Sequence, residues 1–191
     1  MRHIVIFALL YLCPLNVVMA EYDTLIIDDR SSGSRVATSG GEWRLITDRV
    51  MGGISDGQLS ADVAGSQGCL RLQGNVTLEN NGGFVQAALD VNRDVLGAVH
   101  EYAGLVLVVQ GNSEQYNVHL RTSDNSLPWQ SYRAAFTATP AWKRVYLPFS
   151  AFEPYRTGKA LNVRRLKRIG IVAIGREFRA DLCIGEVGLF K

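Results

Sequence analysis

The sequence predicts an all-β protein, built as an antiparallel sandwich or barrel, and three observations support this. Short runs rich in Val, Ile, Leu, Tyr and Phe recur at roughly ten-residue spacing over most of the chain. Clusters of Gly, Asn, Asp and Pro separate these runs, as is typical of tight connections between strands. Helical periodicity is nearly absent after residue 20. No linker, repeat or low-complexity tract divides residues 21–191, so we expect them to form one domain.

The first twenty residues form a segment of a different kind. Arg2 gives a positive start, an apolar run follows at 4–12, and Ala20 supplies the small residue that signal peptidases require. The apolar run is much shorter than the roughly 20 residues that span a bilayer. We therefore expect residues 1–20 to be a secretory signal and residues 21–191 to be exported, either to a periplasm or to the medium. An uncleaved signal that anchors the chain is the alternative, and it is the only membrane contact that we expect.

The strands are expected in the following order. The first five cover 24–28, 42–48, 58–63, 69–74 and 83–91, and the other six cover 104–111, 115–122, 131–138, 142–149, 168–175 and 181–190. The runs GLVLVV at 104–109 and IGIVAI at 169–174 are apolar throughout. A continuous apolar run is typical of a central strand that is covered on both faces.

The strands at 115–122 and 131–138 alternate between apolar and polar residues instead. Each therefore predicts one face for the core and one face for solvent. Paired as a hairpin, the two strands would combine their polar sides into one basic surface. We take this surface, with the loop that joins the strands, as the candidate binding face, which comprises Asn117, His119, Arg121, Trp129, Gln130 and Arg133.

Among the three tryptophans, Trp129 stands apart because it lies in a proline-containing turn, SLPWQ. Trp43 and Trp142 lie in expected strands, where large aromatic side chains usually belong to the core. Trp129 is therefore the tryptophan that is placed to stack on a sugar or on a partner protein.

Two cysteines follow the signal, Cys69 and Cys183, and both lie in expected strands. In an oxidising compartment they either form a disulfide or remain as small apolar residues, and geometry decides between the two. No His or second Cys stands at ligand spacing beside either residue, so we expect no metal site.

The charge balance and the scarcity of histidine argue against two classes of function. Lys and Arg number 20 against 18 Asp and Glu, a formal net charge of +2, which does not favour general nucleic-acid binding. Nucleophilic catalysis usually needs a histidine base, and only His100 and His119 follow the signal. Ser55 or Ser131 beside His119 remains the one arrangement to consider. We expect no enzyme activity.

Two glycine-rich stretches, DRVMGGISDGQLS at 48–60 and LENNGGFVQ at 78–86, raise the question of a phosphate-binding loop. The first has no P-loop lysine, and strand-like residues rather than a helix follow it. We therefore expect no bound cofactor. The double glycines instead predict backbone corners, in which Met51 and Phe84 pack inward.

Five motifs occur in a fixed order along the chain. They are W-x-x-x-x-D-R-V-M-G-G-x-S at 43–55, G-x-V-x-L-E-N-N-G-G-F at 74–84, Y-x-V-x-L-R-T at 116–122, Y-x-A-x-F at 132–136 and W-K-R-V-Y-L-P-F-S-A-F-E-P at 142–154. In this respect the chain resembles the complex I intermediate-associated protein 30 family. The resemblance implies a galactose-binding-like jelly-roll β-sandwich. It also marks as signature positions Asp48, Met51, Gly52, Gly53, Ser55, Glu79, Asn80, Asn81, Gly82, Gly83 and Phe84.

The best-known relatives implied by this resemblance are non-catalytic assembly factors that bind intermediates of respiratory complex I. A secretory signal would place this chain outside the compartment of those intermediates. We therefore expect a non-enzymatic exported binding domain that recognises a protein, as an assembly or scaffold factor. The alternative is a carbohydrate-binding protein that uses the same candidate binding face.

Overall fold

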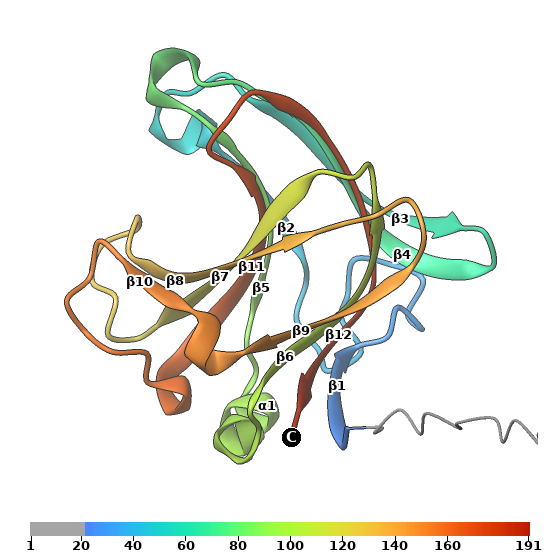
Figure 1. Cartoon of the computed structure of the whole chain (residues 1–191), viewed down its shortest axis with the longest axis vertical. Coiled ribbons are helices and arrows are strands. Elements are labelled where there is room, and N and C mark those ends of the chain that lie inside the picture. The colour runs from blue at the N-terminus through green and yellow to red at the C-terminus, as the bar shows by residue number, and fades with distance from the viewer. Residues whose placement is uncertain (1–21) are drawn as a thin grey trace, which may run out of the picture.

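The computed structural model describes residues 22–191, so the expected signal at 1–20 lies outside the described residues. Two antiparallel sheets of six strands each pack face to face, and this confirms the predicted all-β sandwich (Figure 1). Within residues 22–191 no helix combines the length and the apolar character needed to cross a membrane.

The first sheet lies on the right of Figure 1 and has the order β3–β4–β12–β6–β9, with β1 added beside β12. Its strands are β1 (Thr24–Asp28), β3 (Asp56–Ala64), β4 (Gln67–Val76), β6 (Gly104–Gly111), β9 (Lys143–Pro148) and β12 (Phe178–Phe190). Strand β6 lies between β12 and β9, which is the central position that its continuous apolar run predicted.

The second sheet lies on the left of Figure 1 and has the order β10–β8–β7–β11–β5–β2. Its strands are β2 (Arg44–Thr47), β5 (Phe84–Asp90), β7 (Gln115–Thr122), β8 (Ser131–Thr137), β10 (Glu153–Tyr155) and β11 (Leu166–Ile174). Strand β11 is central, between β7 and β5. Strands β7 and β8 pair antiparallel with His119 opposite Arg133, as the alternating pattern predicted.

Short helical turns connect the strands. They are α1 (Arg93–Ala98), η1 (Asp48–Met51), η2 (Glu79–Asn81), η3 (Val99–Glu101), η4 (Phe149–Ala151) and η5 (Val163–Arg165). Helix α1 begins after Asn92, whose side-chain oxygen accepts a hydrogen bond from the Val95 N–H at 2.9 Å. The sequence did not predict α1 or β10, because segments this short show no clear periodicity.

Three large aromatic residues anchor the core, and each pairs its polar group inside the protein. Trp43, Tyr116 and Tyr132 are fully buried. The Tyr116 hydroxyl donates to Asn112 Oδ1 at 2.7 Å, and the Tyr132 hydroxyl donates to the Ala160 carbonyl at 3.1 Å. A buried aromatic whose polar group is paired adds apolar area without the penalty of an unsatisfied donor.

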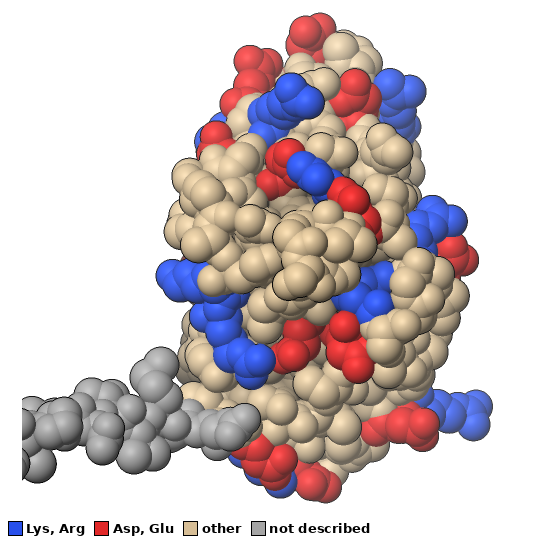
Figure 2. All heavy atoms as spheres, turned by 90° about the vertical axis from the view of Figure 1, so that its right-hand side faces the viewer, with Lys and Arg blue, Asp and Glu red and all other residues tan. Residues whose placement is uncertain are grey.

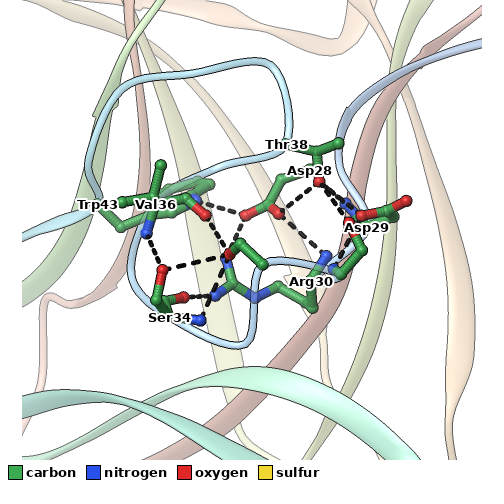
Figure 3. Close-up of polar contacts among 9 residues, drawn as sticks. Asp28, Asp29, Arg30, Ser34, Val36, Thr38 and Trp43 are labelled. Atoms are coloured by element: carbon green, nitrogen blue, oxygen red, sulfur yellow. Dashed lines mark hydrogen bonds and ion pairs between the residues drawn. The ribbon is translucent and has the colours of Figure 1, made fainter.

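Figure 3 shows how the long loop between β1 and β2 is held around Asp28. The buried Asp28 carboxylate accepts from the Trp43 indole N–H at 2.7 Å and from the backbone N–H of Arg30 at 3.0 Å. It also pairs with the buried Arg30 guanidinium, which in turn donates to the Ser34 carbonyl. These contacts tie the loop to a core tryptophan, so we regard the cluster as structural.

Cys69 on β4 and Cys183 on β12 form a disulfide, with their Cα atoms 5.4 Å apart. The bond joins adjacent strands on the outer side of the first sheet. Beside it, the Arg71 guanidinium donates to Asp62 at 3.0 Å and to Asp181 at 2.9 Å. Strands β3, β4 and β12 are thus tied together by a covalent bond and an ion-pair network.

Candidate functional site

The two glycine-rich stretches of the sequence meet at the carboxylate of Asp48. This side chain is fully buried. Its Oδ1 accepts from the Ser55 N–H at 3.0 Å, and its Oδ2 accepts from the Ser55 hydroxyl and from the backbone N–H of Gly83 at 2.6 Å. Burial raises the pKa of Asp48, but the hydrogen bonds from Ser55, Gly83 and Phe84 outweigh it, so the pKa lies below its ordinary value.

The glycines make room for this carboxylate. A Cβ atom at Gly53 would lie 2.4 Å from Asp48 Cγ, and one at Gly82 would lie 2.5 Å from Asp48 Oδ2. Gly52 adopts a left-handed φ of 94° and closes the turn. In the second stretch Asn80 and Asn81 have φ values of 55° and 58°. Both stretches are backbone corners that surround a buried anion of the protein itself, which leaves no room for a phosphate.

The expectation that Met51 packs inward is wrong, because 61% of its surface is exposed. Val50, Ile54 and Leu78 on the same two loops are also exposed. Phe84 is half-buried, but it lies on the side of β5 that carries Gln86, which is the outer side of the sheet and not the core side. The corners are set by hydrogen bonds to Asp48 rather than by inward packing of these apolar side chains. Glu79 is exposed at the start of η2.

The candidate binding face forms the middle of the outer side of the second sheet. Asn117, His119 and Arg121 project from β7, and Arg133 projects from β8, directly opposite His119. On the other side of β7, strand β11 places Gly170 opposite His119. The Gln86 amide lies over Gly170, since a Cβ there would be 2.7 Å from Gln86 Nε2.

His119 is only 8% exposed, and its Nε2 atom has no hydrogen-bond partner within residues 22–191. Burial, and secondarily the positive charge of Arg133, lower the pKa of His119 to about 3. The ring is therefore neutral at physiological pH. A base this weak is poorly suited to remove a proton from a hydroxyl group.

The two arginines beside His119 are each oriented by neighbouring groups. The Arg133 guanidinium carbon lies 3.4 Å from the centre of the Tyr155 ring, and its Nε donates to the Ser131 hydroxyl at 3.1 Å. Arg121 donates through Nη2 to the Leu127 carbonyl at 3.1 Å, while its buried Nε has no partner among the described residues. Burial lowers the pKa of both arginines, as expected for charges that are partly removed from water. Tyr155 lies on β10, which the sequence did not predict.

The loop that carries Trp129 lies at the edge of this face. Trp129 is 50% exposed, which leaves its ring accessible. The side chain of Gln130, on the same loop, holds the loop together. Its Oε1 accepts from the Leu127 N–H at 3.1 Å, and its Nε2 donates to the Arg156 carbonyl at 3.1 Å. Gln130 therefore positions the loop.

The serine and histidine arrangement considered from the sequence is not assembled. The Ser55 hydroxyl is bonded to Asp48, and the Ser131 hydroxyl accepts from Arg133. Neither contacts His119 Nε2. This face therefore offers hydrogen bonds and charge rather than a nucleophile with its base.

The outer side of the first sheet carries one hollow and a mixed distribution of charge, and a second hollow lies at its β3 edge beside the β1–β2 loop. One hollow of about 420 Å³ includes Gln58, Gln73, Asn75 and Arg179 in its lining, and another of about 190 Å³ lies beside Cys69. Figure 2 views this side of the molecule and shows acidic and basic side chains interspersed over it. The lining of the second hollow includes Arg30, whose Nε also lacks a hydrogen-bond partner among the described residues. Its guanidinium is already engaged with Asp28 and with the Ser34 carbonyl, so we do not take either hollow as the site.

A two-sheet fold of this kind places the protein in the class of jelly-roll β-sandwiches. Comparison with family models shows the family as well. Residues 34–184 match the model of complex I intermediate-associated protein 30 (CIA30), and the chain belongs to that family. No curated protein matches the chain in sequence.

Several solved structures with the same fold are carbohydrate-binding modules. The chain is similar to the family 11 module from Clostridium thermocellum, solved with a β-1,3-1,4-mixed-linked tetrasaccharide, with a TM-score of 0.69 and 10% identity over 90% of this chain and 97% of the module. It is also similar to the family 30 module of a Clostridium thermocellum cellulosomal cellulase, with a TM-score of 0.52 and 12% identity over 90% of this chain and 95% of the module. At these identities the likeness confirms the jelly-roll fold and no more.

Proposed function

We propose that this protein is a non-catalytic, exported carbohydrate-binding domain that holds its ligand on the candidate binding face. The observation that carries the proposal is a pair of buried nitrogen atoms there, His119 Nε2 and Arg121 Nε, that have no hydrogen-bond partner among residues 22–191. Buried polar groups in folded proteins are almost always paired, and an unpaired one costs about 1–3 kcal/mol. Two of the five such atoms among the described residues lie on this one face. Both are covered by the protein, so a ligand would pair them when neighbouring side chains of this face move aside.

Saccharides suit this arrangement because each hydroxyl group both donates and accepts hydrogen bonds. The neutral His119 ring and the side chains of Asn117 and Arg121 offer both kinds of partner. Trp129, at the edge, supplies an exposed apolar ring on which a sugar can stack. Sites of this type combine an apolar platform with a few polar groups that fix orientation.

Two further observations support the proposal without establishing it. The fold is shared with carbohydrate-binding modules, one of them solved with a bound tetrasaccharide. The disulfide between Cys69 and Cys183 suits an oxidising compartment, in agreement with the expected signal at 1–20.

A glycan array tests the proposal directly. The purified protein should bind a defined set of glycans saturably, and Trp129→Ala and Arg121→Gln should each weaken binding at least about tenfold. Arg179→Gln is the matched control, because Arg179 is an exposed arginine beside the hollow on the first sheet. A protein that binds no glycan while its melting curve shows a folded domain would contradict the proposal.

A second candidate function is protein binding, as an assembly or scaffold factor, and a separate observation favours it. Val50 and Met51 are 76% and 61% exposed on a loop that Asp48 holds in place, with Ile54 and Leu78 exposed beside them. Apolar side chains on a rigid loop are common in protein contacts. Membership of the complex I intermediate-associated protein 30 family points the same way.

A photo-crosslinking residue at Met51 tests this candidate in the native host. The same residue at Val63, which is 62% exposed on β3, is the control. A defined partner that is crosslinked from position 51 and not from position 63 would support protein binding. Equal crosslinking from both positions would count against it.

A further inference from the structure

Only some of the arginines on the outer side of the second sheet have an acidic partner among the described residues. Arg44 and Arg168 both pair with Asp90, through contacts of 2.5 Å and 2.6 Å. Arg121 and Arg133 form no ion pair within residues 22–191. Glu153 stands opposite Arg133 in the strand register, but it forms no ion pair with it. Two positive charges beside His119 therefore have no ion-pair partner among the described residues.

These two guanidinium groups are arranged to bind rather than to move freely. Arg121 lies two residues from His119 on β7 and on the same face, a separation of about 7 Å along the strand. Arg133 faces His119 from β8, and the Tyr155 ring supports the flat side of its guanidinium. A guanidinium group has five N–H donors. Among the described residues Arg121 donates to the Leu127 carbonyl and Arg133 donates to the Ser131 hydroxyl, so most of the donors of each guanidinium stay available.

The surroundings of Arg121 and Arg133 favour the binding of a negatively charged group between them. Both arginines are half-buried, and a charge that is partly removed from water is stabilised by a partner of opposite sign. His119 is neutral at physiological pH, so it adds hydrogen bonding without a third positive charge. A ligand of neutral sugars alone would leave both guanidinium groups without an ion-pair partner.

We infer that the glycan held on this face is acidic, and that a carboxylate or sulfate group on the sugar binds between Arg121 and Arg133 beside His119. This inference rests on the proposed function, and it names the class of ligand. Uronic acids and sulfated sugars share the required chemistry. Guanidinium groups bind both anions through paired N–H donors, and carboxylates fit them in a planar, two-point arrangement.

The test compares matched polymers that differ only in charge. Polygalacturonate is set against its methyl ester, and dextran sulfate against dextran, with affinity measured by titration calorimetry. The acidic member of one pair should bind at least about tenfold more tightly at about 0.1 M salt, and the preference should shrink at about 1 M salt. The pair that shows the preference identifies the anion as carboxylate or sulfate.

The variants test whether the preference for acidic polymers depends on this face or on positive charges elsewhere on the protein. Arg121→Gln should remove most of the preference, Arg121→Lys should keep part of it, and Arg179→Gln should leave it unchanged. Arg133→Gln is the second test, and its melting temperature shows whether loss of the Tyr155 contact has affected folding. Only the variants that melt as wild type are interpreted.

The outcomes distinguish the inference from the proposed function. If the neutral polymers bind as tightly as the acidic ones, or if Arg121→Gln keeps the full preference, the inference is wrong while glycan binding stands. If no polymer and no arrayed glycan binds the folded protein, the proposed function itself fails. A preference for the acidic polymer that is lost in Arg121→Gln and kept in Arg179→Gln supports both the inference and the proposed function.

Discussion

The carboxylate of Asp48 accepts a hydrogen bond at 2.6 Å from the backbone N–H of Gly83, which lies 35 residues further along the chain. The same carboxylate also accepts from Ser55 and Phe84. No lysine or arginine forms an ion pair with it within residues 22–191, so backbone and hydroxyl donors alone stabilise this buried charge. Asp48 thus joins the two stretches that carry the family signature.

Asp48→Asn should destabilise the fold by about 2–4 kcal/mol. An amide replaces one accepting oxygen with a donor that faces other donors, so buried N–H groups lose their partner. Urea denaturation measures the change. Asp56→Asn is the control, because Asp56 is exposed and accepts from the Asn75 N–H at 2.8 Å. Equal stability of the two variants would show that the contacts of Asp48 do not hold the corner.

The contribution of Asp48 should depend on pH in a defined direction. Its pKa is lower in the folded protein than the value of about 3.9 for an unfolded aspartate. The stabilisation is therefore fully present above about pH 4 and is lost as the pH falls through the folded pKa. Urea midpoints of wild type and Asp48→Asn should differ most at neutral pH and converge in acid. A difference that grows on acidification would contradict this.

Gly53→Ala should lower the free energy of unfolding by about 1–3 kcal/mol. The added methyl group would lie 2.4 Å from Asp48 Cγ, so the backbone or the carboxylate must move. Gly158→Ala is a matched control, since nothing lies within 4 Å of its Cβ position. Thermal unfolding of both variants gives the comparison. A wild-type melting temperature for Gly53→Ala would show that the loop accommodates the added methyl group without cost.

Removal of the disulfide by Cys69→Ala with Cys183→Ala should destabilise the protein by about 3–5 kcal/mol. The bond closes a loop across 114 residues of sequence, and long loops restrict the unfolded chain most. Chemical denaturation with and without reductant checks this result on the wild-type protein. No response to reductant would mean that the two thiols are not paired in solution.

Much of the fold can be predicted from the sequence, because the residue pattern that marks a strand lies within the strand itself. The expected strands at 24–28, 104–111 and 115–122 agree with β1, β6 and β7 at both ends. The hairpin pattern also placed His119 and Arg133 on one face. The family resemblance is confirmed over residues 34–184.

The features that escaped prediction depend on contacts between distant residues. The hydrogen bond between Asp48 and Gly83 joins residues far apart in sequence and leaves no local signal. The sequence therefore predicts that the glycine-rich loops are corners, but it does not show that Asp48 holds them together. Met51 was placed inside because apolar residues usually are, but hydrogen bonds fix its loop and leave it exposed. The alternation of apolar and polar residues along β7 predicts the face on which His119 lies. The burial of His119 depends on side chains of neighbouring strands, which this pattern does not show.

The most direct test of glycan binding is an NMR titration of the protein with an acidic oligosaccharide, following the indole N–H signals and the His119 ring nitrogens. We predict saturable shifts for Trp129 and His119, while the fully buried Trp43 stays unchanged as an internal reference. Shifts confined to residues of the first sheet, or no shifts at all in the folded protein, would contradict the placement of a glycan on this face.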